Sequence, residues 1–251
     1  MRVLLGVAGV LGFLALAETA GRVGLIDPAA VPLASTVLAS ALALATDADF
    51  LAGVGATLLP CVTGLAIAVG VAVPLGLLLG SVPPVERSVR PLVEFLRPIP
   101  SVSLIPLAMF LFTDSQDAKT ALIVYTCSWP ILINTLYGLA DVDPLAKQTL
   151  RAFGFGPLSV ALRVSLPSAA PFIATGIRIA VSVTLIVAVS VELVAGGEGG
   201  IGQFQSVAAT GNRVDRVLAA SIWAGLIGLG ANLLLLALER RVFRWRQEVA
   251  A

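Results

Sequence analysis

The sequence predicts an all-α integral membrane protein with six transmembrane helices. Hydrophobic residues make up 58% of the chain, and charged residues only 12%, about half the share of a typical soluble domain. The mean hydropathy is +0.99. Long apolar runs alternate with short polar segments, and a helix needs about 20 apolar residues to cross a bilayer. These observations together predict membrane spans rather than a soluble core.

The first span is predicted at residues 1–20. A cleaved signal peptide is the alternative, because Arg2 precedes the run and small residues end it. Residues 21–51 form an external segment with a short interfacial helix at 33–45, too short to span. Residues 52–245 form a core of five further spans, and residues 246–251 form a cytoplasmic tail. The five runs are 53–80, 99–113, 118–140, 172–195 and 217–238.

The orientation follows from the placement of Lys and Arg, which gather on the cytoplasmic side of membranes. With the N-terminus inside, the inner segments hold eleven of these residues and the outer segments hold four. The inner set is Arg2, Arg87, Arg90, Arg97, Lys147, Arg151, Arg163, Arg240, Arg241, Arg244 and Arg246, and the outer set is Arg22, Lys119, Arg213 and Arg216. Both termini and residues 141–171 are therefore predicted to be cytoplasmic.

The loop 141–171 is too polar and too broken to span. Asp143-Pro144 favours a helix start, with an acidic cap before a proline in the first turn. Gly154 permits the left-handed conformation that ends a helix, and a second short helix is predicted to end at Leu166-Pro167. Phe153 and Phe155 would lie exposed at the corner, which is costly unless something covers them. Either a partner protein covers them or the loop packs on its own bundle.

Polar and ionisable residues within the spans are candidates for a solute path. Arg178 and Glu192 are costly inside a bilayer, and a structural role in holding helices together is favoured over a gate. Prolines break the third span and free backbone groups, which is tolerated where a helix lines a cavity. Hydrogen bonding between helices is the alternative role. The remaining candidates are Pro98, Pro100, Ser101, Ser103 and Asn134.

Several chemistries lack their residues in this sequence. A phosphate-binding loop needs Gly-Lys-Ser/Thr, whereas Lys119 follows Ala118 and Lys147 precedes Gln148. No Cys or His cluster offers a metal site, and no catalytic residue is predicted. The formal net charge of +1 gives no reason to expect a nucleic acid partner. The chain is therefore predicted to be neither an enzyme nor a binder of its own cofactor.

A resemblance to a known family rests first on the cytoplasmic loop. Residues 148–154, followed by nine residues and then Val164-Ser165-Leu166-Pro167, resemble the signature of ABC-importer permeases. That signature reads Glu-Ala-Ala, three residues, Gly, nine residues, Ile, one residue, Leu-Pro. Gln148-Thr149-Leu150 replaces Glu-Ala-Ala here. Over residues 30–245 the chain resembles the nitrate, sulfonate, taurine and bicarbonate subgroup at Pro74-Leu75-Gly76, Arg97-Pro98-Ile99-Pro100, Ile133-Asn134-Thr135, Gly176-Ile177-Arg178-Ile179-Ala180 and Val191-Glu192.

The resemblance implies a type I ABC-importer-like permease whose short cytoplasmic coupling helices dock on a separate ATPase. The coupling residues would be Gln148, Arg151, Phe153, Gly154, Phe155, Leu158, Val164, Leu166 and Pro167. It implies two ATPase subunits that bind ATP and Mg, a second permease copy, and an extracytoplasmic solute-binding protein. It also implies a bacterial inner membrane, contact with its lipids, and a small anionic solute such as sulfonate, nitrate or taurine. An ion-coupled secondary transporter and a non-transporting membrane scaffold are the alternatives.

Overall fold

A computed structural model describes residues 2–27, 30–196 and 199–243, and every regular element in these ranges is helical. The predicted tail 246–251 lies outside the described residues. The elements are α1 (Arg2–Arg22), α2 (Ala34–Leu44), α3 (Ala48–Ser81), α4 (Pro83–Leu96), the 3₁₀ helix η1 (Ser101–Leu104), α5 (Ile105–Leu111), α6 (Ser115–Ala140), α7 (Pro144–Ala152), α8 (Pro157–Val160), the π turn η2 (Ala161–Ser165), α9 (Leu166–Ala195), α10 (Ile201–Thr210) and α11 (Val214–Val242).

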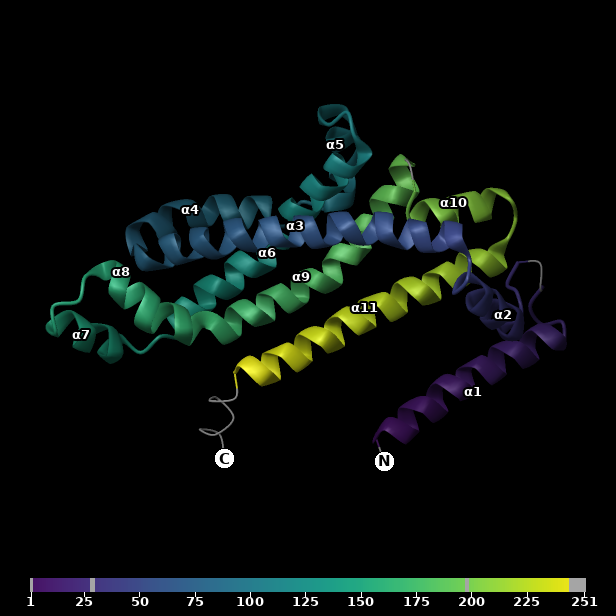
Figure 1. Cartoon of the computed structure of the whole chain (residues 1–251), viewed down its shortest axis with the longest axis horizontal. Coiled ribbons are helices and arrows are strands. Elements are labelled where there is room, and N and C mark those ends of the chain that lie inside the picture. Colours follow the sequence, from purple (N-terminus) through teal and green to yellow (C-terminus); the bar gives the residue numbers. More distant parts are fainter. Residues whose placement is uncertain (1, 28–29, 197–198, 244–251) are drawn as a thin grey trace.

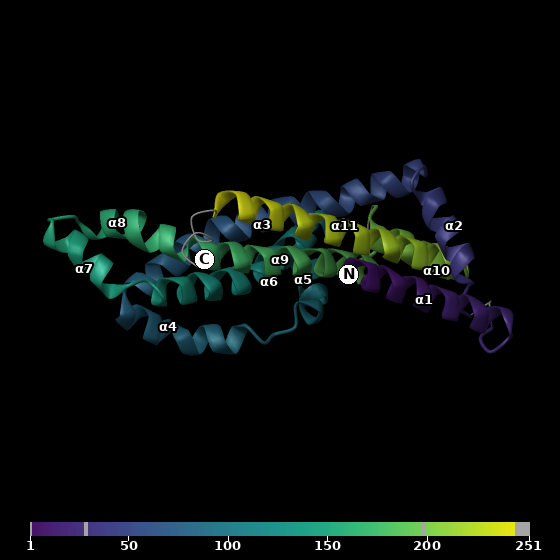
Figure 2. The ribbon, with the colours of Figure 1, turned by 90° about the horizontal axis from the view of Figure 1, so that it is seen from below.

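The long helices run side by side along the molecule. In Figures 1 and 2, α3, α9 and α11 lie lengthwise, with α7 and α8 at one end and α2 and α10 at the other. Acidic caps start two of the long helices, as the sequence allows: Asp47 accepts from the Asp49 and Phe50 amides, and Asp114 accepts from the Gln116 amide. The bundle thus has one end built from α7 and α8 and an opposite end built from α2 and α10.

Four helices are long and apolar enough to cross a membrane: α3, α6, α11 and the continuous helix Pro157–Ala195. They confirm helices at four of the predicted runs, 53–80, 118–140, 172–195 and 217–238. The short helix predicted at 33–45 is confirmed as α2. The first predicted span coincides with the 21 residues of α1, which is not among these four. The total of six spans therefore stays a prediction.

The third predicted span, 99–113, is wrong as a single helix. The apolar part is only the seven-residue α5, and the pair formed by α4 and the segment Ser101–Leu111 is bent by 80°. Pro98 and Pro100 lie at the bend. Proline lacks a backbone N–H and disfavours helix in the residue before it, so the chain cannot continue straight. Counting this bent pair as one span raises the number of candidate spans to five.

The predicted end of the second short helix at Leu166-Pro167 is also wrong. Residues Pro157–Ala195 form one continuous helix of 39 residues. The π turn η2 lies directly before Pro167, and the Leu166 amide donates to the Ala161 carbonyl, five residues back. Proline normally clashes with the carbonyl four residues before it, and we attribute the continuation to the wider turn, which moves that carbonyl away. The helix therefore passes through the proline.

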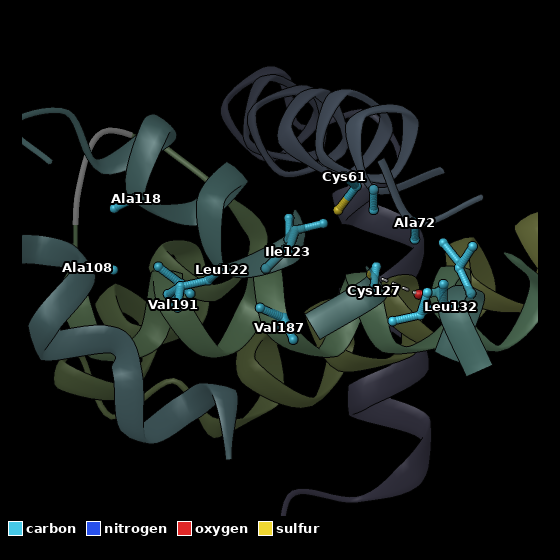
Figure 3. Packing of buried hydrophobic residues seen from close by; sticks show 14 of the residues in the cluster. Cys61, Ala72, Ala108, Ala118, Leu122, Ile123, Cys127, Leu132, Val187 and Val191 are labelled. Atoms are coloured by element: carbon cyan, nitrogen blue, oxygen red, sulfur yellow. Dashed lines mark hydrogen bonds between the residues drawn. The ribbon is translucent and has the colours of Figure 1, made fainter. Parts of the chain in front are cut away.

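The core lies where α3, α6 and α9 pack together. Its side chains are small or branched, among them Ile123, Leu132 and Val187 (Figure 3). Cys61 and Cys127 are free and buried here, as small buried hydrophobes are. A Cβ atom at Gly176 would lie 2.9 Å from the Pro130 carbonyl oxygen. The small residues thus let α6 and α9 approach closely, as is typical of helix packing in membranes.

Candidate functional site

The corner between α7 and α8, residues 143–160, forms one end of the molecule (Figure 1). The Asp143 side chain caps α7 by accepting from the Leu145 amide at 2.8 Å. Gly154 has φ of +81°, and the Phe155 amide donates to the Leu150 carbonyl while the Gly154 amide donates to the Arg151 carbonyl. These two bonds are the Schellman pattern, which satisfies the carbonyls left free at a helix end. The predicted left-handed role of Gly154 is confirmed.

The corner presents apolar side chains to its surroundings. Phe153 is 77% exposed and Leu158 is 72% exposed, so the loop does not bury them on its own bundle. The guanidinium of Arg163 lies 5.0 Å from the centroid of the Phe155 ring, a cation–π contact that orients this ring. An exposed apolar surface held in fixed geometry is typical of an interaction site.

The structure places most of the predicted coupling residues on this surface. Val164 and Leu166 differ, because they lie half-buried in the continuous helix beyond the corner. Pro167 is exposed but also lies in that helix, beyond the corner. The exposed members at the corner are Gln148, Arg151, Phe153, Gly154, Phe155 and Leu158.

The predicted solute-path residues do not come together. Asn134 donates to the Pro130 carbonyl of its own helix at 2.8 Å. Arg178 lies 3.4 Å from the carboxylate of Glu239 on α11. Lys119 lies 2.6 Å from Glu192, and Asn134 lies 15 residues after Lys119 on α6, about 22 Å along the helix, so Asn134 and Glu192 are far apart. Pro98, Pro100 and Ser103 are exposed at the bend before α5, and Ser101 there is half-buried.

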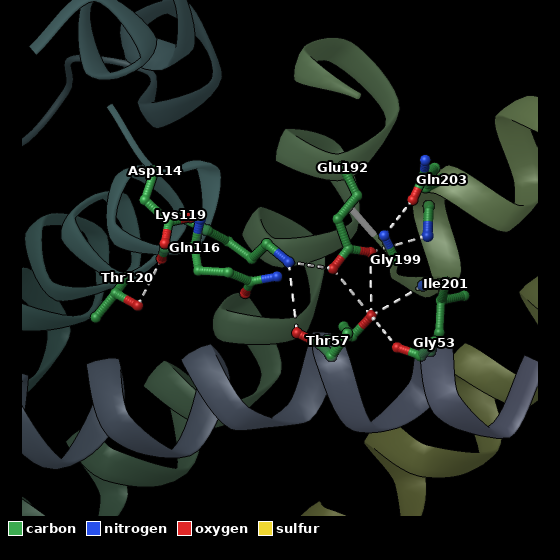
Figure 4. A network of polar contacts seen from close by, with 12 residues as sticks. Gly53, Thr57, Asp114, Gln116, Lys119, Thr120, Glu192, Gly199, Ile201 and Gln203 are labelled. Atoms are coloured by element: carbon green, nitrogen blue, oxygen red, sulfur yellow. Dashed lines mark hydrogen bonds and ion pairs between the residues drawn. The ribbon is translucent and has the colours of Figure 1, made fainter. Parts of the chain in front are cut away.

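Glu192 instead lies at the centre of a buried polar cluster at the α10 end, here called the Glu192 network and shown in Figure 4. Its Oε1 atom is 2.6 Å from Lys119 Nζ, and the two side chains are 2% and 3% exposed. Thr57 Oγ1 lies 2.9 Å from the same carboxylate, and the Gly202 amide donates to Oε2 at 2.9 Å. The Ile201 amide donates to Thr57 Oγ1. Four helices, α3, α6, α9 and α10, meet at this cluster.

The geometry supports the structural role predicted for Glu192. Its carboxylate accepts from a cation, a hydroxyl and a backbone amide, so the buried charge is both paired and hydrogen-bonded, as low polarity requires. The backbone leaves no space beside it: a Cβ atom at Gly200 would lie 2.3 Å from Glu192 Cδ, and Gly200 has φ of +139°. The carboxylate thus fixes the start of α10 against α9.

Sequence reasoning missed Lys119 and α10. Lys119 was counted with the outer segments, but it is buried in α6 and reaches Glu192, 73 positions away in the sequence. A lone lysine in the second turn of an apolar helix signals an intramembrane charge that needs a partner. The end of α10 also has a local sequence signal, Gly211-Asn212, since Gly and Asn favour helix ends. In the structure Asn212 has a positive φ, and the bonds to the Ala208 and Ala209 carbonyls form a second Schellman end.

The part of the chain that the structure describes contains no group of three His, Cys, Asp or Glu side chains that could hold a metal ion. The arrangement offers two features instead. One is an exposed apolar corner, and the other is a rigid buried cluster at the opposite end.

Comparison with known proteins gives a consistent result. The family model described as "Binding-protein-dependent transport system inner membrane component" matches residues 72–244. The nitrate import permease protein NrtB of Leptolyngbya laminosa is 31% identical over 197 residues, covering 78% of this chain and 70% of the relative. The bicarbonate transport system permease protein CmpB of Synechococcus elongatus is 32% identical over 181 residues, 72% of this chain and 65% of the relative.

The fold matches solved structures of the same architecture. A bacterial ABC transporter involved in the import of the acidic polysaccharide alginate superimposes with a TM-score of 0.69 at 15% identity. The match covers 97% of this chain and all of that chain. At this identity the likeness concerns the fold alone.

Proposed function

Because the chain belongs to the family of binding-protein-dependent transport system inner membrane components, we propose that this ABC-importer permease passes a small anionic solute and couples to a separate ATPase through the α7–α8 corner. The permease component is not itself an enzyme; ATP and Mg would be bound by the partner ATPase. Proposed partners are two ATPase subunits, a second copy of this chain, the surrounding lipid and an extracytoplasmic solute-binding protein.

The observation that carries the coupling role is the exposed, rigid corner. Phe153 and Leu158 are largely solvent-exposed, yet their backbone is fixed by the Asp143 cap and the Schellman end at Gly154. A preorganised apolar knob loses little conformational freedom when it docks. Docking in a groove of the ATPase would bury both side chains and transmit discrete shifts of a packed interface.

The solute class is supported by the names of two relatives, a nitrate import permease protein and a bicarbonate transport system permease protein. Both solutes are small anions. The proposed topology has six spans with both termini in the cytoplasm, which places the corner inside the cell and the Glu192 network near the outer face. A binding protein would then deliver solute at the α10 end while ATP closes the ATPase pair at the other.

Affinity purification of the tagged protein from its native membrane, followed by mass spectrometry, tests this function. The expected result is co-purification of a P-loop ATPase, with or without an extracytoplasmic binding protein whose ligand can then be screened by calorimetry against nitrate, bicarbonate, taurine and other sulfonates. A matched Phe153→Asp variant should lose the ATPase and remain inserted. Uptake in vesicles that needs an ion gradient and no ATP would overturn the proposal in favour of a secondary transporter.

A further inference from the structure

A groove of about 480 Å³ lies along α9, α10 and α11. One wall is a stripe of α9 at helical spacing, running from Ser182 through Ile186 to Ser190. The facing wall is a stripe of α11 from Ser221 through Gly225 to Gly228, and Gln205 of α10 lies between them. Eight residues separate Ser182 from Ser190, so the groove is about 12 Å long.

Polar side chains line this groove inside two helices that are apolar enough to span a membrane. Ser182 and Ser221 are exposed, and their hydroxyls donate to carbonyls of their own helices, four residues back. Gln205 is buried, and its amide nitrogen donates to Ser221 Oγ at 2.9 Å. The side-chain amide of Gln205 gains nothing from facing hydrocarbon, and in membrane proteins such groups bond to other helices or face water. The glycines of α11 hollow the same wall, which leaves room for a solute and water.

The Glu192 network holds Gln205, which lies between the two walls of the groove, in place. Glu192 accepts from the Gly202 amide, and a Cβ atom at Gly202 would lie 2.5 Å from the Val189 carbonyl oxygen. The first turn of α10 is therefore locked against α9, and Gln205 follows one turn later. Lys119 and Glu192 thus neutralise each other behind the wall and position an amide on its face.

We propose that this groove is one wall of the solute path, and that the second copy of the chain closes its open side. The inference deepens the proposed function and rests on it. The described residues that line the groove include no ionisable side chain, so the wall offers hydrogen bonds without a fixed charge. Such a wall suits a small hydrophilic solute that keeps part of its hydration shell, because passage needs contacts weak enough to release it.

Cysteine labelling with a charged, membrane-impermeant methanethiosulfonate reagent tests the inference on the assembled complex. Ser190→Cys and Ser182→Cys place thiols in the groove with little change in volume. Leu59→Cys is the matched control, since Leu59 is 67% exposed on α3 and lies two residues from Thr57, at the depth of the Glu192 network. The unmodified chain, with both native cysteines buried, gives the baseline rate.

In the nucleotide-free complex or in the complex with an ATP analogue and the binding protein, both groove thiols should react at least about tenfold faster than the control, because a charged reagent is excluded from hydrocarbon and reacts with thiolate. Groove thiols that react no faster than Leu59→Cys in both states would overturn the inference. The ATPase present in the same preparation is quantified in parallel. Its absence would count against the proposed function, whatever the labelling rates.

Discussion

Replacement of Gly154 by alanine isolates the backbone geometry of the α7–α8 corner from its surface chemistry. Gly154 has φ of +81°, whereas Gly156, two residues later, has φ of −70°. A Cβ atom at either position meets nothing within 4 Å, so neither substitution creates a clash. A non-glycine residue in the left-handed region costs about 1–2 kcal/mol. Gly154→Ala therefore adds strain alone, and Gly156→Ala adds the same methyl group without it.

With glycine the free corner already holds its docking geometry. With alanine this end of α7 is strained and can leave the left-handed conformation in the free permease, so docking must restore that conformation and the strain lowers the affinity. An energy of about 1–2 kcal/mol corresponds to a factor of about 5–30 in an equilibrium constant. The apparent Kd for the ATPase subunit, measured on detergent-solubilised protein, should rise by that factor for Gly154→Ala and stay within about twofold for Gly156→Ala. The thermal unfolding midpoint should not change for either variant. Equal Kd values for both variants and the unmodified chain would refute the reasoning.

Three further predictions concern the corner and the Glu192 network. Phe153→Asp should abolish co-purification of the ATPase without lowering the unfolding midpoint; a lowered midpoint would mean that the ring supports the fold. Glu192→Gln should lower the unfolding free energy by about 3–5 kcal/mol, because it leaves Lys119 buried without its counter-charge. Adding Lys119→Met to the same chain should restore most of the lost stability. A double variant as unstable as the single variant would contradict the pairing. Gly200→Ala should lower the thermal unfolding midpoint, because the new Cβ atom would collide with Glu192. Gly70→Ala should leave the midpoint unchanged, because a Cβ atom at Gly70 meets nothing within 4 Å. Equal midpoints for the two variants would contradict the close packing at Gly200.

The sequence was most informative where the determinants are local. The Asp143-Pro144 start of α7 and the left-handed Gly154 follow from capping chemistry within a few residues. The long spans follow from length and hydropathy. Pro98 and Pro100 marked the break before α5, although the run 99–113 still suggested one helix.

The rest depends on contacts between distant segments. Lys119 and Glu192 lie 73 positions apart in the sequence. A lone lysine in an apolar run indicates that a partner is needed, but no local pattern identifies Glu192 as that partner. The passage of the helix through Pro167 depends on the π turn before it, whereas local rules assign proline to a helix end. The path residues chosen from polarity alone proved scattered, because burial and pairing decide which polar groups face a common space.

The unbroken helix Pro157–Ala195 has a mechanical consequence. Within it, the 30 residues of α9 extend about 45 Å, with the docking corner attached at one end through the π turn and Glu192 near the other. A tilt of α9 by about 10° would displace one end relative to the other by roughly 8 Å. The π turn η2 (Ala161–Ser165) sets the direction in which the corner projects from the helix axis. Removing its one extra residue, so that the turn becomes ordinary α-helix, would rotate the corner by about 100° around that axis.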